Sequence, residues 1–153
     1  MRRDAVRSGG VCLGTPSALL DEALTLFRGA RVEVVSLEGE ELQERLEQAA
    51  YLVLPEAGDE ALPREVIDGF ANGLAVLAPD EGAAAELVEP GRNGLLFEPG
   101  SARSLARQLA WAEAFPEKIR QMGECARADY LARFIGDWSY RKLYGERRRT
   151  ARL

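Results

Sequence analysis

Histidine is absent from this 153-residue chain, and its only cysteines are Cys12 and Cys125. Without an imidazole, the chain can supply neither a histidine-based triad nor the usual ligands of a zinc site, so histidine-dependent chemistry would need another chain. Two cysteines this far apart also predict neither a disulfide framework nor a cluster of metal ligands. We therefore expect no metal site.

Long apolar runs are also missing. No segment approaches the roughly 20 apolar residues that a membrane-spanning helix needs, so no transmembrane segment is expected. The N-terminal sequence MRRDAVRSGG is charged and leads into no signal-like apolar core, which favours a cytoplasmic location. With 46% hydrophobic and 29% charged residues, the composition is typical of a single globular domain spanning residues 1–153.

The charge is unevenly distributed along the chain. From Arg141 onward the sequence holds six Lys or Arg and one Glu, so the net charge of −5 leaves about −10 on the first 140 residues. A basic tail can bind nucleic acid or an anionic membrane, but it also suits the end of a helix, where carbonyl groups attract cations. Because the acidic body would repel phosphate, we expect no nucleic-acid partner and assign residues 136–153 to a C-terminal helix and basic tail.

Short apolar runs alternate with helical patterns along the chain. The expected strands are Val11–Leu13, Val32–Leu37, Leu52–Leu54, Leu74–Ala78 and Gly94–Phe97. A helix is expected over Glu40–Ala50, and because helices separate the first three strands, these strands should be parallel. The predicted fold is α/β: a Rossmann-like, three-layer domain with a parallel sheet of about five strands and a helical C-terminal tail.

Capping residues predict where the helices begin and end. Thr15 is expected to cap the first helix, with Pro16 at its first position and Gly29 closing it. Ser101 should cap the helix after the fifth strand, and that helix should stop before Pro116, which opens the next one.

Two acidic residues follow the third expected strand. Glu60 lies in the loop at its carboxyl end, and Asp68 lies on the second turn of a helix that begins around Pro63 and ends at Asn72-Gly73. Gly82 and Glu86 come after the fourth strand, and Gly91-Arg92-Asn93-Gly94 precedes the fifth. In this order and spacing, the sequence resembles the donor-binding half of retaining, GT-B-type glycosyltransferases of the group 1 family, over roughly residues 50–135.

The resemblance implies roles for both acids. Glu60 would contact the donor sugar and stabilise charge near the reacting carbon. Asp68 would accept hydrogen bonds from the ribose hydroxyls of the nucleotide. The family usually has Glu at the second position, and Asp is one methylene shorter. The plain alternatives are a solvated acid near a helix start and an exposed helix residue.

Further residues would form the phosphate side of the site. Gly82 and Ala83 would present backbone N–H groups to a phosphate, where the family tends to have two glycines. Glu86 would lie one turn into the same helix, with a structural role as its alternative. Arg64, beside Pro63, is the nearest candidate counter-charge for a diphosphate. The resemblance implies a nucleotide diphosphate-sugar as substrate and no cofactor.

The turn Gly91-Arg92-Asn93-Gly94 needs its glycines for backbone conformation, and we do not expect Arg92 to bind the ligand. The chain departs from the family elsewhere. The family's donor half usually has six strands, whereas only about fifty residues precede the third strand here, so one βα unit is missing or compressed. Gly14-Thr15-Pro16-Ser17 stands where a glycine followed by a basic residue is expected, and the acceptor-binding half is absent.

Three hypotheses follow from these observations. The first is the donor-binding domain of a glycosyltransferase, which transfers a hexosyl group only together with an acceptor domain. The second is a degenerate, inactive relative that serves in protein–protein assembly, and the third is an unrelated flavodoxin-like ligand-binding domain. A last helix, capped by Asp137 and packed through Trp138, Tyr140 and Tyr144, would contact an acceptor domain or a second copy of the chain.

Overall fold

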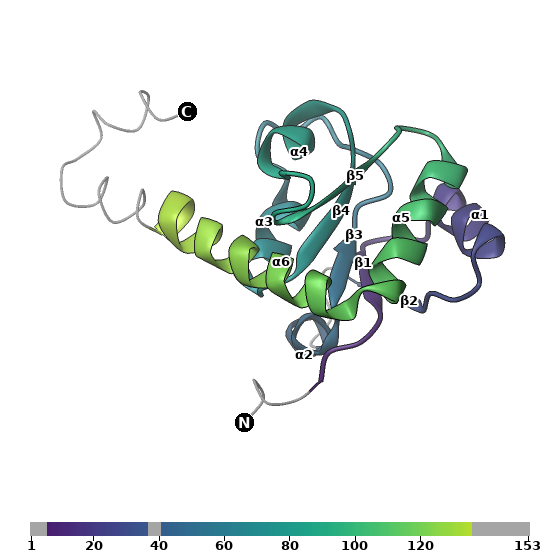
Figure 1. Ribbon diagram of the computed structural model, residues 1–153. Coiled ribbons are helices and arrows are strands. Elements are labelled where there is room, and N and C mark those ends of the chain that lie inside the picture. Colours follow the sequence, from purple (N-terminus) through teal and green to yellow (C-terminus); the bar gives the residue numbers. More distant parts are fainter. Residues whose placement is uncertain (1–5, 37–40, 136–153) are drawn as a thin grey trace.

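The computed structural model describes residues 6–36 and 41–135 (Figure 1). Its strands are β1 (Gly10–Leu13), β2 (Val32–Val35), β3 (Tyr51–Val53), β4 (Ala75–Pro79) and β5 (Gly94–Phe97). They form one sheet in the order β2-β1-β3-β4-β5, and every neighbouring pair is parallel. This confirms the predicted α/β fold with a parallel sheet of five strands.

Helices cover both faces of the sheet. They are α1 (Ala18–Leu26), α2 (Leu42–Gln48), α3 (Arg64–Ala71), α4 (Gly82–Leu87), α5 (Ala102–Ala114), α6 (Pro116–Tyr130) and the π-helical turn η2 (Leu131–Ile135). Helices α1 and α5 pack on one face, and α2, α3 and α4 pack on the other. Helix α6 starts against the first layer and ends against the second (Figure 1). The three-layer prediction is confirmed.

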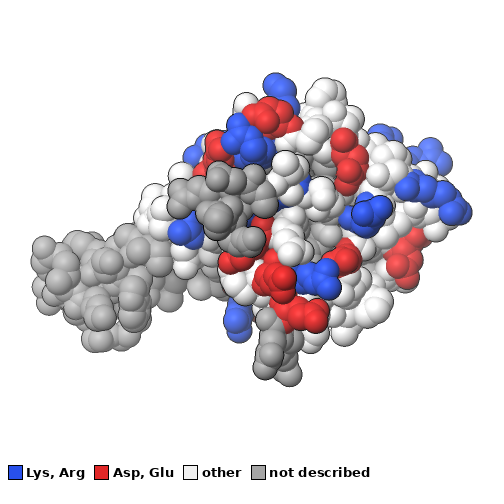
Figure 2. All heavy atoms as spheres, turned by 90° about the horizontal axis from the view of Figure 1, so that it is seen from below, with Lys and Arg blue, Asp and Glu red and all other residues white. Residues whose placement is uncertain are grey.

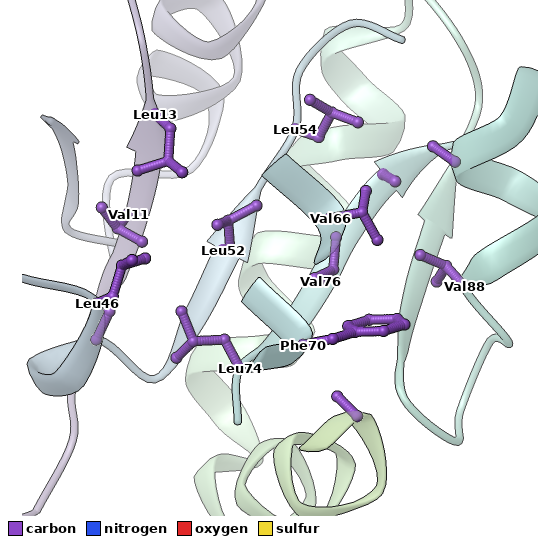
Figure 3. Packing of buried hydrophobic residues seen from close by; sticks show 14 of the residues in the cluster. Val11, Leu13, Leu46, Leu52, Leu54, Val66, Phe70, Leu74, Val76 and Val88 are labelled. Atoms are coloured by element: carbon purple, nitrogen blue, oxygen red, sulfur yellow. The ribbon is translucent and has the colours of Figure 1, made fainter. Parts of the chain in front are cut away.

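Side chains alternate between the two layers because successive residues of a strand point to opposite faces. Leu52 and Val76 are fully buried against the layer that holds Val66 and Phe70 of α3, as Figure 3 shows. Leu77, the neighbour of Val76, faces the opposite layer with α1 and α5. Burial on both faces explains why these strands are continuous apolar runs rather than alternating ones.

The strand order explains the shortened N-terminal half. A classic dinucleotide-binding sheet has the order 3-2-1-4-5-6, and removing its strand 3 leaves the order found here once the strands are renumbered. The same order also occurs in flavodoxin-like folds, so topology alone does not separate these two hypotheses. In either case the chain reverses its direction of winding between β1 and β3, which is where such folds bind ligands.

Several predicted strand boundaries shift by one or more residues. The third strand was expected over Leu52–Leu54 but is Tyr51–Val53, because Tyr51 already pairs with Gly10 and with Ala75. The fourth was expected over Leu74–Ala78 but is Ala75–Pro79. The second was expected to reach residue 37, which lies outside the described residues, but its ladder with β1 ends at Val35.

The first helix begins later and ends earlier than predicted. Its cap is Ser17, not Thr15: the Ser17 hydroxyl accepts a hydrogen bond from the Leu20 N–H at 3.2 Å. Thr15 lies in a bend and Pro16 lies outside the helix, so Thr15 is two residues too early to cap it. The helix ends at Leu26 because Phe27 is extended, so Gly29 lies beyond its end.

Helix α2 is also shorter than the expected Glu40–Ala50. The Ser101 cap and the helix opening at Pro116 are confirmed, since the Ser101 hydroxyl accepts from the Ser104 N–H at 3.0 Å. The predicted Asp137-capped helix with its aromatic residues lies outside the described residues. Among the helices described, none combines the length and the apolar character that crossing a bilayer requires.

Helix α6 packs across the amino end of the sheet, where β4 begins. A Cβ atom at Gly123 would collide with the carbonyl oxygen of Gly73, so this crossing depends on glycine. Nearby, the Arg127 guanidinium donates to the carbonyl of Ala71 at the end of α3. The Asn72 carbonyl accepts from Arg7 at 2.9 Å. Packing therefore closes the amino end of the sheet beside β4, and folds of this topology bind their ligands at the carboxyl end.

Candidate functional site

Three loops leave the carboxyl ends of β1, β3 and β4. The loop after β1 contains Gly14, whose φ of +103° requires glycine and whose side-chain position has no atom within 4 Å. The loops after β3 and β4 approach each other, because a Cβ atom at Gly82 would lie 3.9 Å from the Cβ of Ala57. The edge therefore has an open position beside β1 and a contact between the next two loops.

Glu60 lies in the exposed loop between β3 and α3. Its carboxylate folds back over its own loop, since a Cβ atom at Gly58 would collide with Glu60 Oε1. No hydrogen bond or ion pair joins this carboxylate to another described residue. Glu60 is therefore accessible and unpaired, which fits both the predicted contact with a substrate and its plain alternative, a solvated acid.

Asp68 is the most perturbed acid of the predicted set. It lies half-buried on α3, and its carboxylate has no hydrogen bond or ion pair with any other described residue. Burial raises the pKa of Asp68 above its ordinary value, and the charge of Arg64, one turn earlier, lowers it in part. A desolvated carboxylate without a donor has free capacity to accept hydrogen bonds from a ligand.

Arg64 is exposed at the first position of α3, where Pro63 precedes it without providing a side-chain cap. Its charge acts on Asp68, so the two residues share one side of the helix at the i, i+4 spacing. Its predicted role as a counter-charge to a diphosphate stays a prediction.

The loop after β4 presents the predicted phosphate residues. Gly82 is exposed and begins α4 with a φ of +68°, a left-handed conformation that an L side chain rarely adopts. Ala83 is partly exposed beside it, and Glu86 points to solvent one turn later. The requirement for glycine at 82 is thus conformational, because the nearest atom leaves room for a methyl group.

The structure brings the loops that hold Glu60 and Gly82 to one edge, and it places Arg64 near Asp68. No hydrogen bond or ion pair joins Glu60, Asp68 and Glu86 to one another within the described ranges. The predicted set did not include Glu65, whose charge adds to burial in raising the pKa of Cys12 to about 11. Its place between Arg64 and Asp68 was the available signal. Cys12 and Cys125 are both free thiols.

The turn before β5 has a structural role, as predicted. Arg92 donates two hydrogen bonds to Asp129 on α6, at 2.6 and 2.8 Å, and so is not free to bind a ligand. Asn93 is 1% exposed and donates to the same carboxylate at 2.8 Å. Gly91 has a φ of +84°, and a Cβ atom at Gly94 would collide with the Val76 carbonyl. Both glycines meet backbone requirements.

A groove of about 510 Å³ lies at the opposite, amino end of β1. Residues around it include Gly10, Arg31, Arg45 and Glu113. Figure 2 views this end of the molecule from below and shows acidic and basic side chains side by side. None of the predicted site residues lines this groove, so it is not part of the candidate site.

Comparison with known proteins places the chain in a family. Residues 17–129 match the family described as glycosyl transferases group 1. The chain belongs to the group 1 glycosyltransferases. This membership excludes the unrelated flavodoxin-like hypothesis, which the strand order had left open.

Solved structures share the fold. The Anabaena protein HepE, in complex with UDP, is 21% identical with a TM-score of 0.68, covering 84% of this chain and 45% of that one. The catalytic domain of a cholesterol α-glucosyltransferase from Helicobacter pylori is 15% identical with a TM-score of 0.68, covering 81% of this chain and 98% of that one. This chain therefore shares its fold with nearly the whole of that domain.

A curated relative is much longer. An exopolysaccharide phosphotransferase of Streptomyces coelicolor is 30% identical over 97 residues, which are 63% of this chain and 10% of that protein. The chain thus spans about a tenth of this relative and less than half of the Anabaena protein.

Proposed function

We propose that this chain is the donor-binding domain of a retaining glycosyltransferase in the cytoplasm. A nucleotide diphosphate-sugar binds at the carboxyl edge of the sheet, and a hexosyl group is transferred only when an acceptor-binding domain covers that edge. The observation that carries the proposal is the half-buried Asp68 carboxylate, which has no donor among the described residues. It lies on the helix that follows the loop of Glu60, in a chain of this family.

Each residue has a part in the proposed site. Asp68 accepts hydrogen bonds from the two ribose hydroxyls, which replace the water lost on burial. Glu60 contacts the sugar and stabilises positive charge that develops at the reacting carbon. Gly82 and Ala83 let backbone N–H groups approach the diphosphate.

The diphosphate meets few cations at this edge. The loops after β3 and β4 carry Glu56, Asp59, Glu60, Asp80 and Glu81. Arg64 is the counter-charge that we assign, and the remaining charge must be neutralised by backbone donors, added cations or the acceptor domain. We therefore expect the isolated domain to bind a nucleotide diphosphate weakly and to need the second domain for turnover.

Calorimetric titration with UDP, GDP and ADP tests the proposal. UDP comes first because the Anabaena relative is in complex with it. We expect saturable binding of one nucleotide, and Asp68→Ala should weaken it about tenfold to a hundredfold, because hydrogen bonds to a charged group are worth about 1.5–3 kcal/mol. Glu60→Ala should leave nucleotide affinity unchanged and remove only the extra affinity of the nucleotide-sugar.

Glu124→Ala is the matched control, because it removes an exposed carboxylate from α6 at the opposite edge. Equal losses in this variant and in Asp68→Ala would indicate a general charge effect and refute the assigned role. Silence from all three nucleotides in a folded protein would refute donor binding by the domain.

The second candidate function is a degenerate module that serves in protein–protein assembly. Asp68 in place of the family's Glu, together with the acidic edge described above, favours this alternative. It predicts no nucleotide binding and no response to Asp68→Ala, so the same titration separates the two functions.

A further inference from the structure

Strand β2 forms one outer edge of the sheet, since its only strand neighbour among the described residues is β1. In the six-stranded order, the equivalent strand is internal and pairs on both sides. The loss of one βα unit therefore exposes a strand side that a related sheet covers. Val34 on this strand is 41% exposed.

The outward-facing backbone groups of β2 belong to Val32 and Val34. The carbonyls of Arg31 and Val35 accept hydrogen bonds from Gly10 and Gly14 of the β1 segment, at 2.8 and 2.9 Å. Backbone groups alternate in direction along a strand, so those of the residues between them point away from β1. This edge can accept another strand by main-chain hydrogen bonds.

The side chains on the edge select a partner and a register. Arg31 is exposed, and its guanidinium has no hydrogen bond or ion pair among the described residues. Glu33 lies two residues further along, on the same face, and one oxygen of its carboxylate already accepts a hydrogen bond from Arg45 of the same chain at 2.9 Å. The other carboxylate oxygen is the one left for a partner copy. If two copies pair antiparallel with Val32 opposite Val32, each Arg31 lies opposite the Glu33 of the partner copy.

Other registers are less favourable. Moving the pairing so that Val32 lies opposite Val34 would place Glu33 against Glu33, where like charges repel. In the favoured register the two copies of Val32 form a hydrogen-bonded pair, in which each N–H donates to the carbonyl of the other. Arg31 and Glu33 then occupy the neighbouring non-hydrogen-bonded positions, where side chains lie closer together.

We infer that this edge joins two copies of the chain about a two-fold axis, through antiparallel pairing of their β2 strands. The two sheets then form one continuous sheet, with symmetric Arg31–Glu33 pairs on one face. Because a four-residue strand buries much less than the roughly 1,200 Å² of a standard interface, the dimer should be weak and concentration-dependent. The inference does not depend on nucleotide binding.

Sedimentation equilibrium of the full chain over a wide concentration range tests this arrangement. Val32→Pro removes the outward N–H at the two-fold axis, a change that an edge strand tolerates, and should abolish the dimer. Val32→Thr keeps the N–H and the branched shape, so this control should still dimerise. Circular dichroism should show both variants folded.

Charge reversal provides a second, independent test. Arg31→Glu and Glu33→Arg should each raise the dimer dissociation constant by about tenfold, because two symmetric pairs become repulsive. Arg31→Glu is the cleaner variant, since Glu33→Arg also removes the ion pair with Arg45 of the same chain. The double variant, Arg31→Glu with Glu33→Arg, should restore dimerisation. A chain that is monomeric at every concentration would overturn the inference, as would a dimer that ignores these changes and so uses another surface.

Discussion

Two aspartates, Asp129 on α6 and Asp68 on α3, have opposite electrostatic environments. Asp129, at the amino end, receives hydrogen bonds from Arg92 and Asn93, which hold its pKa below its usual range. Asp68 lies on a helix that leaves the carboxyl end, has no donor among the described residues, and has a pKa raised by burial. The ionised form is stabilised by the fold at the first position and destabilised at the second.

The difference separates residues that hold the fold from residues that are available to a ligand. At the amino end, side chains bond to one another or to backbone: Arg127 to Ala71, Arg7 to Asn72, and Tyr51 to Glu113 at 2.6 Å. At the carboxyl end, acids are left unpaired and glycines leave space. A fold that keeps an unsatisfied carboxylate accepts a loss of stability, which is common at functional sites.

The largest expected effect on stability comes from adding a methyl group at Gly123, where α6 crosses the amino end of β4. Gly123→Ala forces α6 away from the Gly73 carbonyl, and we expect it to lower the free energy of unfolding by about 3 kcal/mol, despite the better helix propensity of Ala. Gly58→Ala is the matched change at the carboxyl end, where the added atom meets only the movable Glu60 carboxylate, so little loss is expected. Urea unfolding measures both, and equal losses would contradict the comparison.

A smaller effect is expected from protonating Asp129. Because its folded pKa is depressed, its contribution is present above the unfolded value of about 3.8 and is lost as pH falls through the folded pKa. We expect Asp129→Asn to cost about 1 kcal/mol at pH 6, discounted for partial exposure. At the lowest pH that preserves folding, this cost should shrink. Urea unfolding at several pH values tests this, and a constant difference would show that the charge is not responsible.

The sequence predicted the buried sheet better than the ends of its elements. Apolar runs such as Leu74–Ala78 identify strands because both faces are buried, but one hydrogen bond at either end moves a boundary, as with Tyr51. The N-cap of α1 was assigned to Thr15 because Pro16 suits a first helical turn. The choice of Ser17 depends on local backbone geometry, which the sequence does not specify.

The sequence predicted which residues belong to the candidate site, but not their burial or their hydrogen-bond partners. Spacing identified Glu60 and Asp68, but the partial burial of Asp68 depends on residues from other elements, and the position of the Glu60 carboxylate over Gly58 depends on the conformation of its loop. The partner of Arg92 was equally hidden, because Asp129 lies 37 positions away on a different helix. Charge complementarity between distant segments is set by packing, and no local pattern in the sequence records it.

The smallest expected effect on stability is also the most informative. Asp68→Asn removes a charge that the fold desolvates without a donor, and it keeps the shape of the side chain. Because the folded pKa of Asp68 is raised, the wild-type protein loses stability as pH rises from below about 3.8 through that pKa, and the variant does not. At neutral pH we therefore expect Asp68→Asn to be as stable as the wild type or more stable by up to about 1 kcal/mol, after discounting for partial exposure and for the lost attraction between Asp68 and Arg64.

A clear loss of stability in urea unfolding at pH 7 would mean that the Asp68 carboxylate stabilises the fold, as that of Asp129 does. A stable variant that no longer binds a nucleotide would instead identify Asp68 as a residue retained at the expense of stability for its ligand.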